Sequence, residues 1–141
     1  MSLFDRLSKI GGNKDISLTP KGAFALSAMT IIGIDGSIEE EEIDALQRIV
    51  RGDRDAFDQA YKVYKDRSVS ECIQVVDKSL NEKQKVAVIA NLLDLAMADG
   101  MLAGSEEELL TSYINTFQIP DDIVKDIIDV VSIKNDFSVF D

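Results

Sequence analysis

The stretch that decides the fold is TPKGAFALSAMTIIGIDGSIEEEEIDAL, residues 19–46. Its first part is apolar almost all round, so a helix formed there has to be buried on every side. Thr19 and Pro20 are typical of an N-cap and a first helical residue, and the helix is expected to run to about Asp35. Gly36 then predicts a left-handed stop. An amphipathic helix is expected to begin in the four glutamates that follow.

A second stretch, AMADGMLAGSEEELL at residues 96–110, repeats this pattern. Shifting the first copy by 64 positions, the separation of Asp35 and Asp99, aligns Ala23 with Ala87, Ile31 with Leu95, Gly36 with Gly100, Ile38 with Leu102 and Leu46 with Leu110. Each half thus contains a nearly all-apolar helix, and each of these helices needs the other to be covered. We expect both at the centre of the molecule, related by a pseudo-twofold axis.

Helical spacing of apolar residues continues along nearly all of the chain. The prediction is an all-α, single-domain multihelical bundle over residues 1–141. Its expected parts are a short N-terminal amphipathic helix that carries Leu3, Phe4, Leu7 and Ile10, a first repeat over about 19–66, a short helix over about 68–80, a second repeat over about 81–132, and a C-terminal tail. Phe137 and Phe140 in the tail are expected to dock on the body of the domain.

The charge of the chain argues against nucleic acids and anionic lipids as partners. The 141 residues carry a net charge of −11, and no basic residue occurs between Lys85 and Lys125. Such a surface repels DNA, RNA and anionic lipid, while it attracts cations and basic protein surfaces. Other proteins are therefore the expected partners. The sequence leaves the oligomeric state open.

The residue types that are absent argue against catalysis and against secretion. There is no histidine, which removes Ser-His and Cys-His catalytic pairs and imidazole metal ligands, and there is no phosphate-binding glycine loop. We predict that the protein is not an enzyme. The single cysteine, Cys72, fits a reducing cytoplasm. No apolar run approaches the roughly 18 residues of a membrane span, and the N-terminus lacks a signal sequence, so a cytoplasmic protein is expected.

Two interpretations apply to the Asp-Gly turns. In the first, glycine ends one helix, and the aspartate and glutamates cap the next one and favour the positive end of its dipole. In the second, the carboxylates also bind a cation. The spacings Asp35-Gly36-x-Ile38-x-x-x-Glu42 and Asp99-Gly100-x-Leu102-x-x-x-Glu106 match the second half of an EF-hand calcium loop.

The first half of such a loop is missing from both copies. Where that loop needs carboxylates, the chain has Ile31 and Gly33 in one copy and Leu95 and Met97 in the other, so a true EF-hand is excluded. Each turn alone offers two or three carboxylates, too few for a tight site. Two turns brought together would supply four or more oxygens. Alternatively, each turn would bind one weakly held ion, completed by water and backbone carbonyls.

The duplicated pattern resembles the TerB-like domain of tellurite-resistance proteins, which also occurs at the membrane-proximal end of some J-domain co-chaperones. The segments that carry the resemblance are IDGSIEEEEI and MADGMLAGSEEELL, and the two halves cover about residues 19–132. The resemblance implies two central buried helices and an acidic face that binds a divalent cation. It also links the chain to stress response and to metal-related complexes at membranes.

Six carboxylates match the motif of this family: Asp35, Glu41, Glu42, Asp99, Glu106 and Glu107. Oxygen ligands favour calcium, magnesium or manganese over zinc. The second copy departs from the stricter pattern, because Gly104 and Ser105 replace acids that the first copy has.

Three functions stay open at this point. The leading one is a non-enzymatic module that binds a cation, partner proteins or both through its acidic face. A metal-free helical adaptor, in which the acids only cap helices, is the alternative. A carboxylate-only metal hydrolase is the third, and the absence of histidine argues against it.

Overall fold

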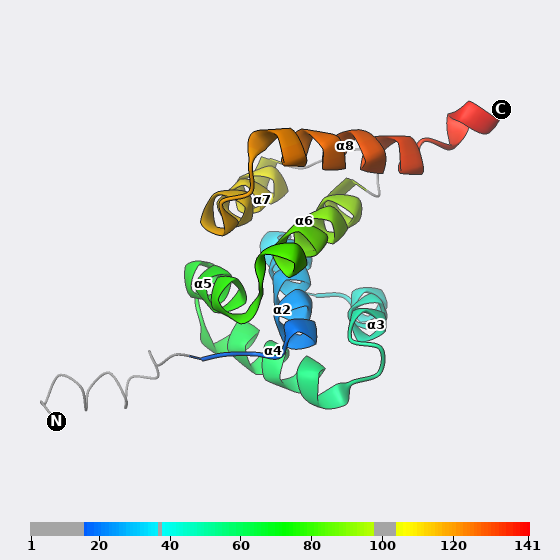
Figure 1. Ribbon diagram of the computed structural model, residues 1–141. Helices are drawn as coiled ribbons and strands as arrows, with labels where there is room; N and C mark the ends of the chain where they lie inside the picture. The colour runs from blue at the N-terminus through cyan, green and yellow to red at the C-terminus, as the bar shows by residue number, and fades with distance from the viewer. Residues whose placement is uncertain (1–15, 37, 98–103) are drawn as a thin grey trace, which may run out of the picture.

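The structure is a computed structural model that describes residues 16–36, 38–97 and 104–141 (Figure 1). These ranges form α2 (Pro20–Ile32), η1 (Gly33–Asp35), α3 (Glu40–Ile49), α4 (Arg54–Asp66), α5 (Val69–Ser79), α6 (Glu82–Met97), α7 (Gly104–Phe117), α8 (Asp121–Asn135) and η2 (Phe137–Phe140), where η denotes a 3-10 helix. The all-α prediction is confirmed, and the described ranges contain no strand. No helix within them is long and apolar enough to cross a bilayer. The predicted N-terminal helix falls in residues 1–15, outside the described part.

Helix α2 lies at the centre of the molecule and packs against α3, α4, α5, α6 and α7 (Figure 1). Five of its apolar side chains are fully buried: Ala23, Ala25, Leu26, Ala28 and Met29. The three alanines allow neighbouring helices to approach closely, while the larger leucine and methionine fill the space that remains. Residues 22–31 are buried apart from the half-buried Phe24, which explains why this part of the helix has no polar face in the sequence.

Helix α6, the apolar helix of the second half, packs against α2 as expected and also against α7 and α8. Its buried residues are Val88, Ile89, Leu92, Leu93 and Ala96, but Ala87 and Asn91 are exposed. One face of α6 therefore meets solvent, which distinguishes it from α2. The pseudo-twofold relation between the two halves stays a prediction.

Local capping places several helix starts. The side-chain oxygen of Thr19 accepts a hydrogen bond from the Gly22 N–H at 3.1 Å, and that of Asp53 accepts one from the Ala56 N–H at 3.1 Å. The Asn81 side chain caps α6 by accepting from the Gln84 N–H at 2.8 Å. The cap at Thr19 agrees with the sequence prediction. Each of the three caps satisfies an amide that has no partner within its own helix.

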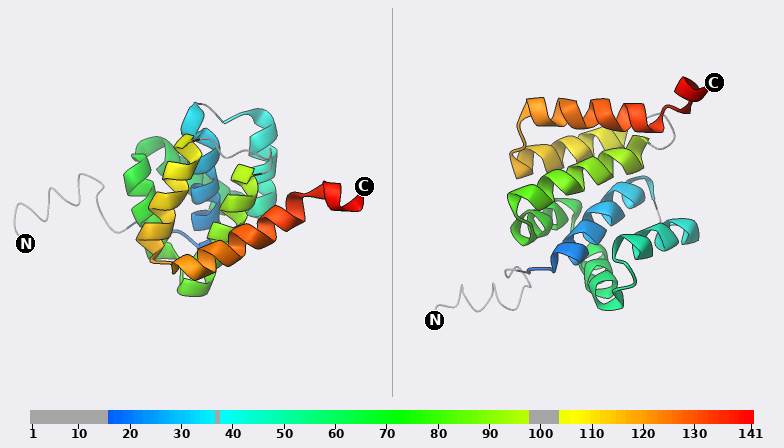
Figure 2. Two further views of the ribbon diagram at one scale, coloured as in Figure 1. Left: turned by 90° about the horizontal axis from the view of Figure 1, so that it is seen from above. Right: turned by 45° about the vertical axis from the view of Figure 1, so that its right-hand side comes forward.

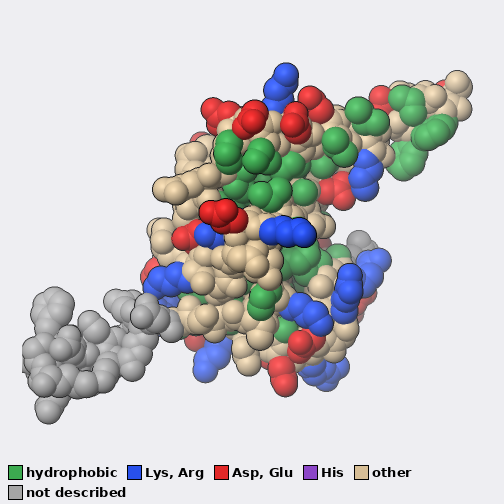
Figure 3. Space-filling view, viewed as in Figure 1, with side chains coloured by type: hydrophobic (Ala, Val, Ile, Leu, Met, Phe, Trp, Pro, Cys, Tyr) green, Lys and Arg blue, Asp and Glu red, His purple; other side chains and the backbone are tan. Residues whose placement is uncertain are grey.

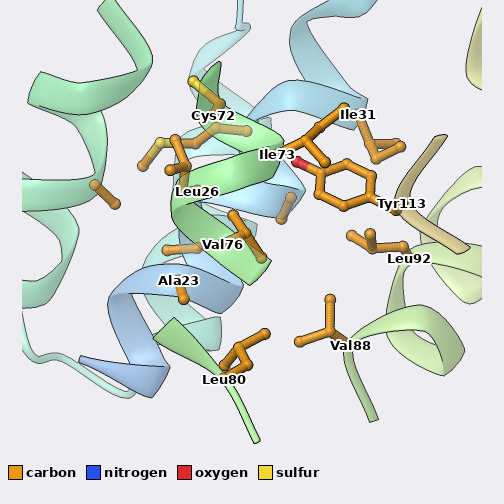
Figure 4. Close-up of a cluster of buried hydrophobic side chains, with 14 of the residues drawn as sticks. Ala23, Leu26, Ile31, Cys72, Ile73, Val76, Leu80, Val88, Leu92 and Tyr113 are labelled. Carbon is orange, nitrogen blue, oxygen red and sulfur yellow. The ribbon is translucent and has the colours of Figure 1, made fainter. Parts of the chain in front are cut away.

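A buried hydrogen bond joins the two halves inside the core. Tyr113 of α7 is fully buried, and its hydroxyl lies 2.6 Å from Thr30 Oγ1 of α2. Thr30 donates its own proton to the Ser27 carbonyl at 2.7 Å, so Tyr113 is the donor in the pair. Figure 4 shows the Tyr113 ring among side chains of α2, α5 and α6. Burial raises the pKa of Tyr113, which keeps the hydroxyl protonated as a donor.

Cys72 belongs to the same cluster, where it is 1% exposed (Figure 4). Burial raises the pKa of its thiol to about 11. A thiol with so high a pKa is almost entirely protonated at neutral pH, and the thiolate is the reactive form. Cys72 is therefore a core residue with little reactivity.

Helix α8 covers α6 from outside, with Val131 as its buried residue. Its last turn is held by Asp94 of α6, whose carboxylate accepts from Lys134 Nζ at 3.1 Å and from Asn135 Nδ2 at 3.0 Å. The chain then continues outward in the direction of α8 (Figure 2). Phe137 and Phe140 are 73% and 82% exposed. The expectation that these rings dock on the body is therefore wrong, because the tail forms the short helix η2 and leads away from it.

Candidate functional site

The first Asp-Gly turn follows α2 without a break. The α-helix ends at Ile32 rather than near Asp35, and the chain tightens into the 3-10 turn η1, closed by a hydrogen bond from the Gly36 N–H to the Gly33 carbonyl at 3.1 Å. Gly36 has φ +149° and ψ −125°, a conformation open to glycine alone. The predicted stop is thus at a glycine with positive φ, although it is not the left-handed helical conformation that we expected.

Gly33 lets the turn pack closely on α4. A Cβ atom at this position would overlap Tyr64 Oη, and Ile38 Cγ1 would lie 3.5 Å away. Burial, followed by the charge of the nearby Tyr61, raises the pKa of Tyr64, so its phenol stays neutral. Tyr64 and Ile38 together fix the position of the turn relative to the core. The neighbouring sequence does not indicate this role of Tyr64, because its spacing from other apolar residues marks it only as part of a helical apolar stripe.

The glutamates after the turn begin α3. Glu42 Oε1 accepts a hydrogen bond from the Glu39 N–H at 2.8 Å, which is half of a capping box. The carboxylate of Glu42 therefore stabilises the helix start, as the first interpretation predicts.

Three of the six predicted site carboxylates have described side chains. Glu42 and Glu106 are half-buried, and Glu107 is exposed in the first turn of α7. The side chains of Asp35 and Glu41 are outside the described part of the structure, and so is the whole of Asp99. Among the described residues, no three acidic or cysteine side chains are grouped closely enough to hold a metal ion.

The backbone nevertheless relates the two halves of the predicted site. Turn η1, which ends at Asp35, contacts α7, whose first turn carries Glu106 and Glu107. Seen from above, η1 lies beside the yellow amino-terminal part of α7 (Figure 2, left). The first Asp-Gly turn is thus next to the acidic helix of the second half. Sequence spacing had suggested such a meeting without establishing which elements make it.

A family model for tellurite resistance protein TerB matches residues 21–128. The chain belongs to the TerB family. The match runs from the first turn of α2 into α8, so it includes both halves of this TerB domain and both Asp-Gly turns. No curated protein and no solved structure matches the chain. The tail after α8 lies beyond the residues matched.

Proposed function

We propose that this TerB domain is a non-enzymatic cytoplasmic binding module whose two Asp-Gly turns form one acidic, cation-binding face. The carboxylates assigned to it are Asp35, Glu41, Glu42, Asp99, Glu106 and Glu107. Carboxylate oxygens suit calcium, magnesium or manganese better than zinc. With a cation bound, this face and its remaining negative charge would form a docking surface for partner proteins, including those of complexes at membranes.

The observation that carries the proposal is the contact between η1 and α7. A hard cation needs six to eight oxygen ligands, and neither turn supplies enough carboxylates alone. A contact between the first turn and the acidic helix of the second half supports a site built jointly. Water molecules and the backbone carbonyls of the turns would complete the coordination.

Docking of a basic protein surface follows from the same charge distribution. Helix α7 carries Glu106, Glu107 and Glu108 close to its start at Gly104, and the matched region contains no Lys or Arg between Lys85 and Lys125. Acidic surfaces of this kind raise the rate at which basic partners associate, in a manner that added salt weakens. A bound divalent cation would reduce the repulsion within this surface and so set the partner that it accepts.

A metal-free helical adaptor is the second candidate function. The hydrogen bond from the Glu39 N–H to Glu42 favours it, since the glutamate already has a structural use as a cap. On this alternative the acids only begin helices and repel unsuitable partners. The two candidates differ in whether stability responds to a cation.

The test is a thermal-shift and calorimetric titration of the full chain with calcium, magnesium, manganese and zinc. Wild type is compared with Asp35→Asn, Asp99→Asn and the double variant, and with Asp129→Asn on the exposed face of α8 as a matched control. A cation that binds only the folded state stabilises it by about 2.7 kcal/mol at a hundredfold excess over Kd. We expect saturable stabilisation by a hard cation in wild type and in the control.

The variants at the turns separate the alternatives. Loss of the response in each single variant would support one joint site, and partial loss would support two independent sites. An unsaturable response that is equal in all variants would reject cation binding. The metal-free adaptor would then be the function to pursue.

A further inference from the structure

The carboxyl end of the molecule exposes a concentrated set of apolar side chains. Five of them are between 63% and 82% exposed: Val130, Ile133, Phe137, Val139 and Phe140. Figure 3 shows hydrophobic side chains on the projecting C-terminal segment and beneath α8, while acidic side chains follow the outer edge of α8. A monomeric protein rarely exposes so many large apolar groups together, and such patches are usual at interaction sites.

The two phenylalanines are presented on one side of an ordered segment. Residues 136–141, the aromatic tail, contain the 3-10 helix η2, where side chains three positions apart eclipse each other. Phe137 and Phe140 have this spacing. Asp136 fixes the start of η2 by accepting from the Ser138 N–H at 3.0 Å and from the Ser138 hydroxyl. The tail is thus a compact aromatic projection that keeps both rings in solvent.

The same molecule has an apolar groove that no described segment fills. It lies between α2, α3 and α6, has a volume of about 260 Å³, and is floored by Phe24, Ile49, Leu80 and Val88. Benzene occupies an apolar cavity of about 150 Å³, so a phenyl ring has room in this groove. The groove and the aromatic tail match in chemistry as well as in size.

Charge also matches between the two surfaces. The groove is bordered by exposed Lys21 and Arg51, and the rings of the tail are flanked by the carboxylates of Asp136 and Asp141. On a chain of net charge −11, most of the surface repels an acidic segment. The groove combines an apolar floor with positive charge at its edge, as an acidic and aromatic segment requires.

We propose that the aromatic tail of a second copy of this chain occupies the groove, and that two copies exchange tails reciprocally. Asp94, which holds the end of α8, lies on the same stripe of α6 as Asn91 and Ala87, which line the groove. The end of α8 is therefore attached to α6 about one helical turn, roughly 5 Å along the axis of α6, beyond the residues that line the groove. A twofold axis near this point would place the tail of each copy in the groove of the other.

The direction of the tail and the area that it would bury favour the tail of a second copy as the occupant of the groove. Within its own molecule the tail leads away from α2, α3 and α6, whose residues line the groove, so it is available to another copy (Figure 1). A closed twofold exchange leaves no free tail or groove from which a filament could grow. Four phenylalanine rings, at about 150–250 Å² each, with the surface that they cover, approach the roughly 1,200–2,000 Å² of a stable interface.

The experiment is sedimentation equilibrium of the full chain over a wide range of concentration. Three variants accompany wild type. Phe137→Ser/Phe140→Ser has a groove and no aromatic tail, and Ala87→Glu has a tail and a blocked groove. Val69→Ser, an exposed apolar residue of α5 outside the tail and the groove, is the control. All these side chains are exposed, so the fold is kept. Wild type and the control should dimerise, and each of the other two should show a dimer Kd at least tenfold higher.

Mixing the tail variant with the groove variant distinguishes tail exchange from any other dimer. One intact tail and one intact groove remain in the mixture, so a heterodimer should form where neither variant alone dimerises. A monomer at every concentration, including one whose rings are protected in its own groove, would overturn the proposal. So would a dimer unaffected by both changes.

Discussion

At the scale of single residues, Gly33 occupies a position where a side chain has no room. A Cβ atom there would overlap Tyr64 Oη and lie 3.0 Å from Tyr64 Cζ. Since φ of Gly33 is −87°, alanine would be strained by this contact and not by its backbone. We expect Gly33→Ala to lower the free energy of unfolding by about 1–3 kcal/mol, measured by urea denaturation.

The control for this prediction removes the Tyr64 hydroxyl oxygen, which a Cβ atom at position 33 would overlap. Tyr64→Phe deletes the hydroxyl oxygen while keeping the ring, so Gly33→Ala should cost less in that background. A double-mutant cycle measures the difference as a coupling energy. An equal cost in both backgrounds would contradict the assignment of Tyr64 as the contact that makes glycine necessary.

Residues whose roles are local were predictable, and residues whose roles depend on a distant partner were not. Thr19, Asp53 and Asn81 cap helices through amides three positions ahead, so the sequence alone indicates them. Tyr64 acts on a turn that belongs to a different helix, and Tyr113 donates to Thr30 across the core. Nothing in the neighbouring sequence encodes either contact.

At the scale of elements, the contact between α6 and α8 depends on pH. In it, the Asp94 carboxylate accepts hydrogen bonds from Lys134 and Asn135. The hydrogen bond from Asn135 and the nearby Lys134 hold the pKa of Asp94 below its ordinary value. A carboxyl whose pKa is depressed by folding stabilises the folded state above its unfolded pKa, about 3.9 for aspartate. The contribution is lost as the pH falls through the folded pKa. Docking of α8 should therefore weaken selectively in acid.

Hydrogen exchange along the chain would measure this effect. Protection factors of α8 amides should fall relative to those of α2 as the pH drops below about 4. Asp94→Asn removes the titrating group, so the ratio of α8 to α2 protection should be lower at neutral pH and change little on acidification. A wild-type ratio that is constant with pH would contradict the role of Asp94.

The helices were predictable because apolar residues recur at helical spacing along nearly all of the chain. The end of α2 and the position of the C-terminal tail were not predictable. Helix α2 ends at Ile32 because the chain tightens into η1, a change that involves the packing of Gly33 on α4. The tail was expected to dock because Phe137 and Phe140 are apolar. Apolar character alone does not distinguish a surface covered by its own domain from one presented to another molecule.

At the scale of the whole molecule, the sequence repeat indicated two related halves without indicating how they meet. The contact between η1 and α7, which brings the first turn to the acidic helix of the second half, depends on tertiary packing. Six carboxylates could be named from spacing, yet their grouping could not, since Glu42 is already used to cap α3. A sequence repeat indicates which parts are equivalent. How those parts are placed relative to each other depends on the packing of the core.

The core makes the two halves mutually dependent for folding. Helix α2 is buried on the side that meets α6 and α7, and Tyr113 of α7 donates to Thr30 of α2. Residues 1–80 alone would expose that side to water and leave Thr30 without its donor. We expect the fragments 1–80 and 81–141 each to show little cooperative unfolding, and an equimolar mixture to gain helical circular dichroism over the sum of the two. The full chain should unfold in one transition by every probe. A fragment 1–80 that unfolds cooperatively near the full-chain Tm would show instead that the first half is stable without the second.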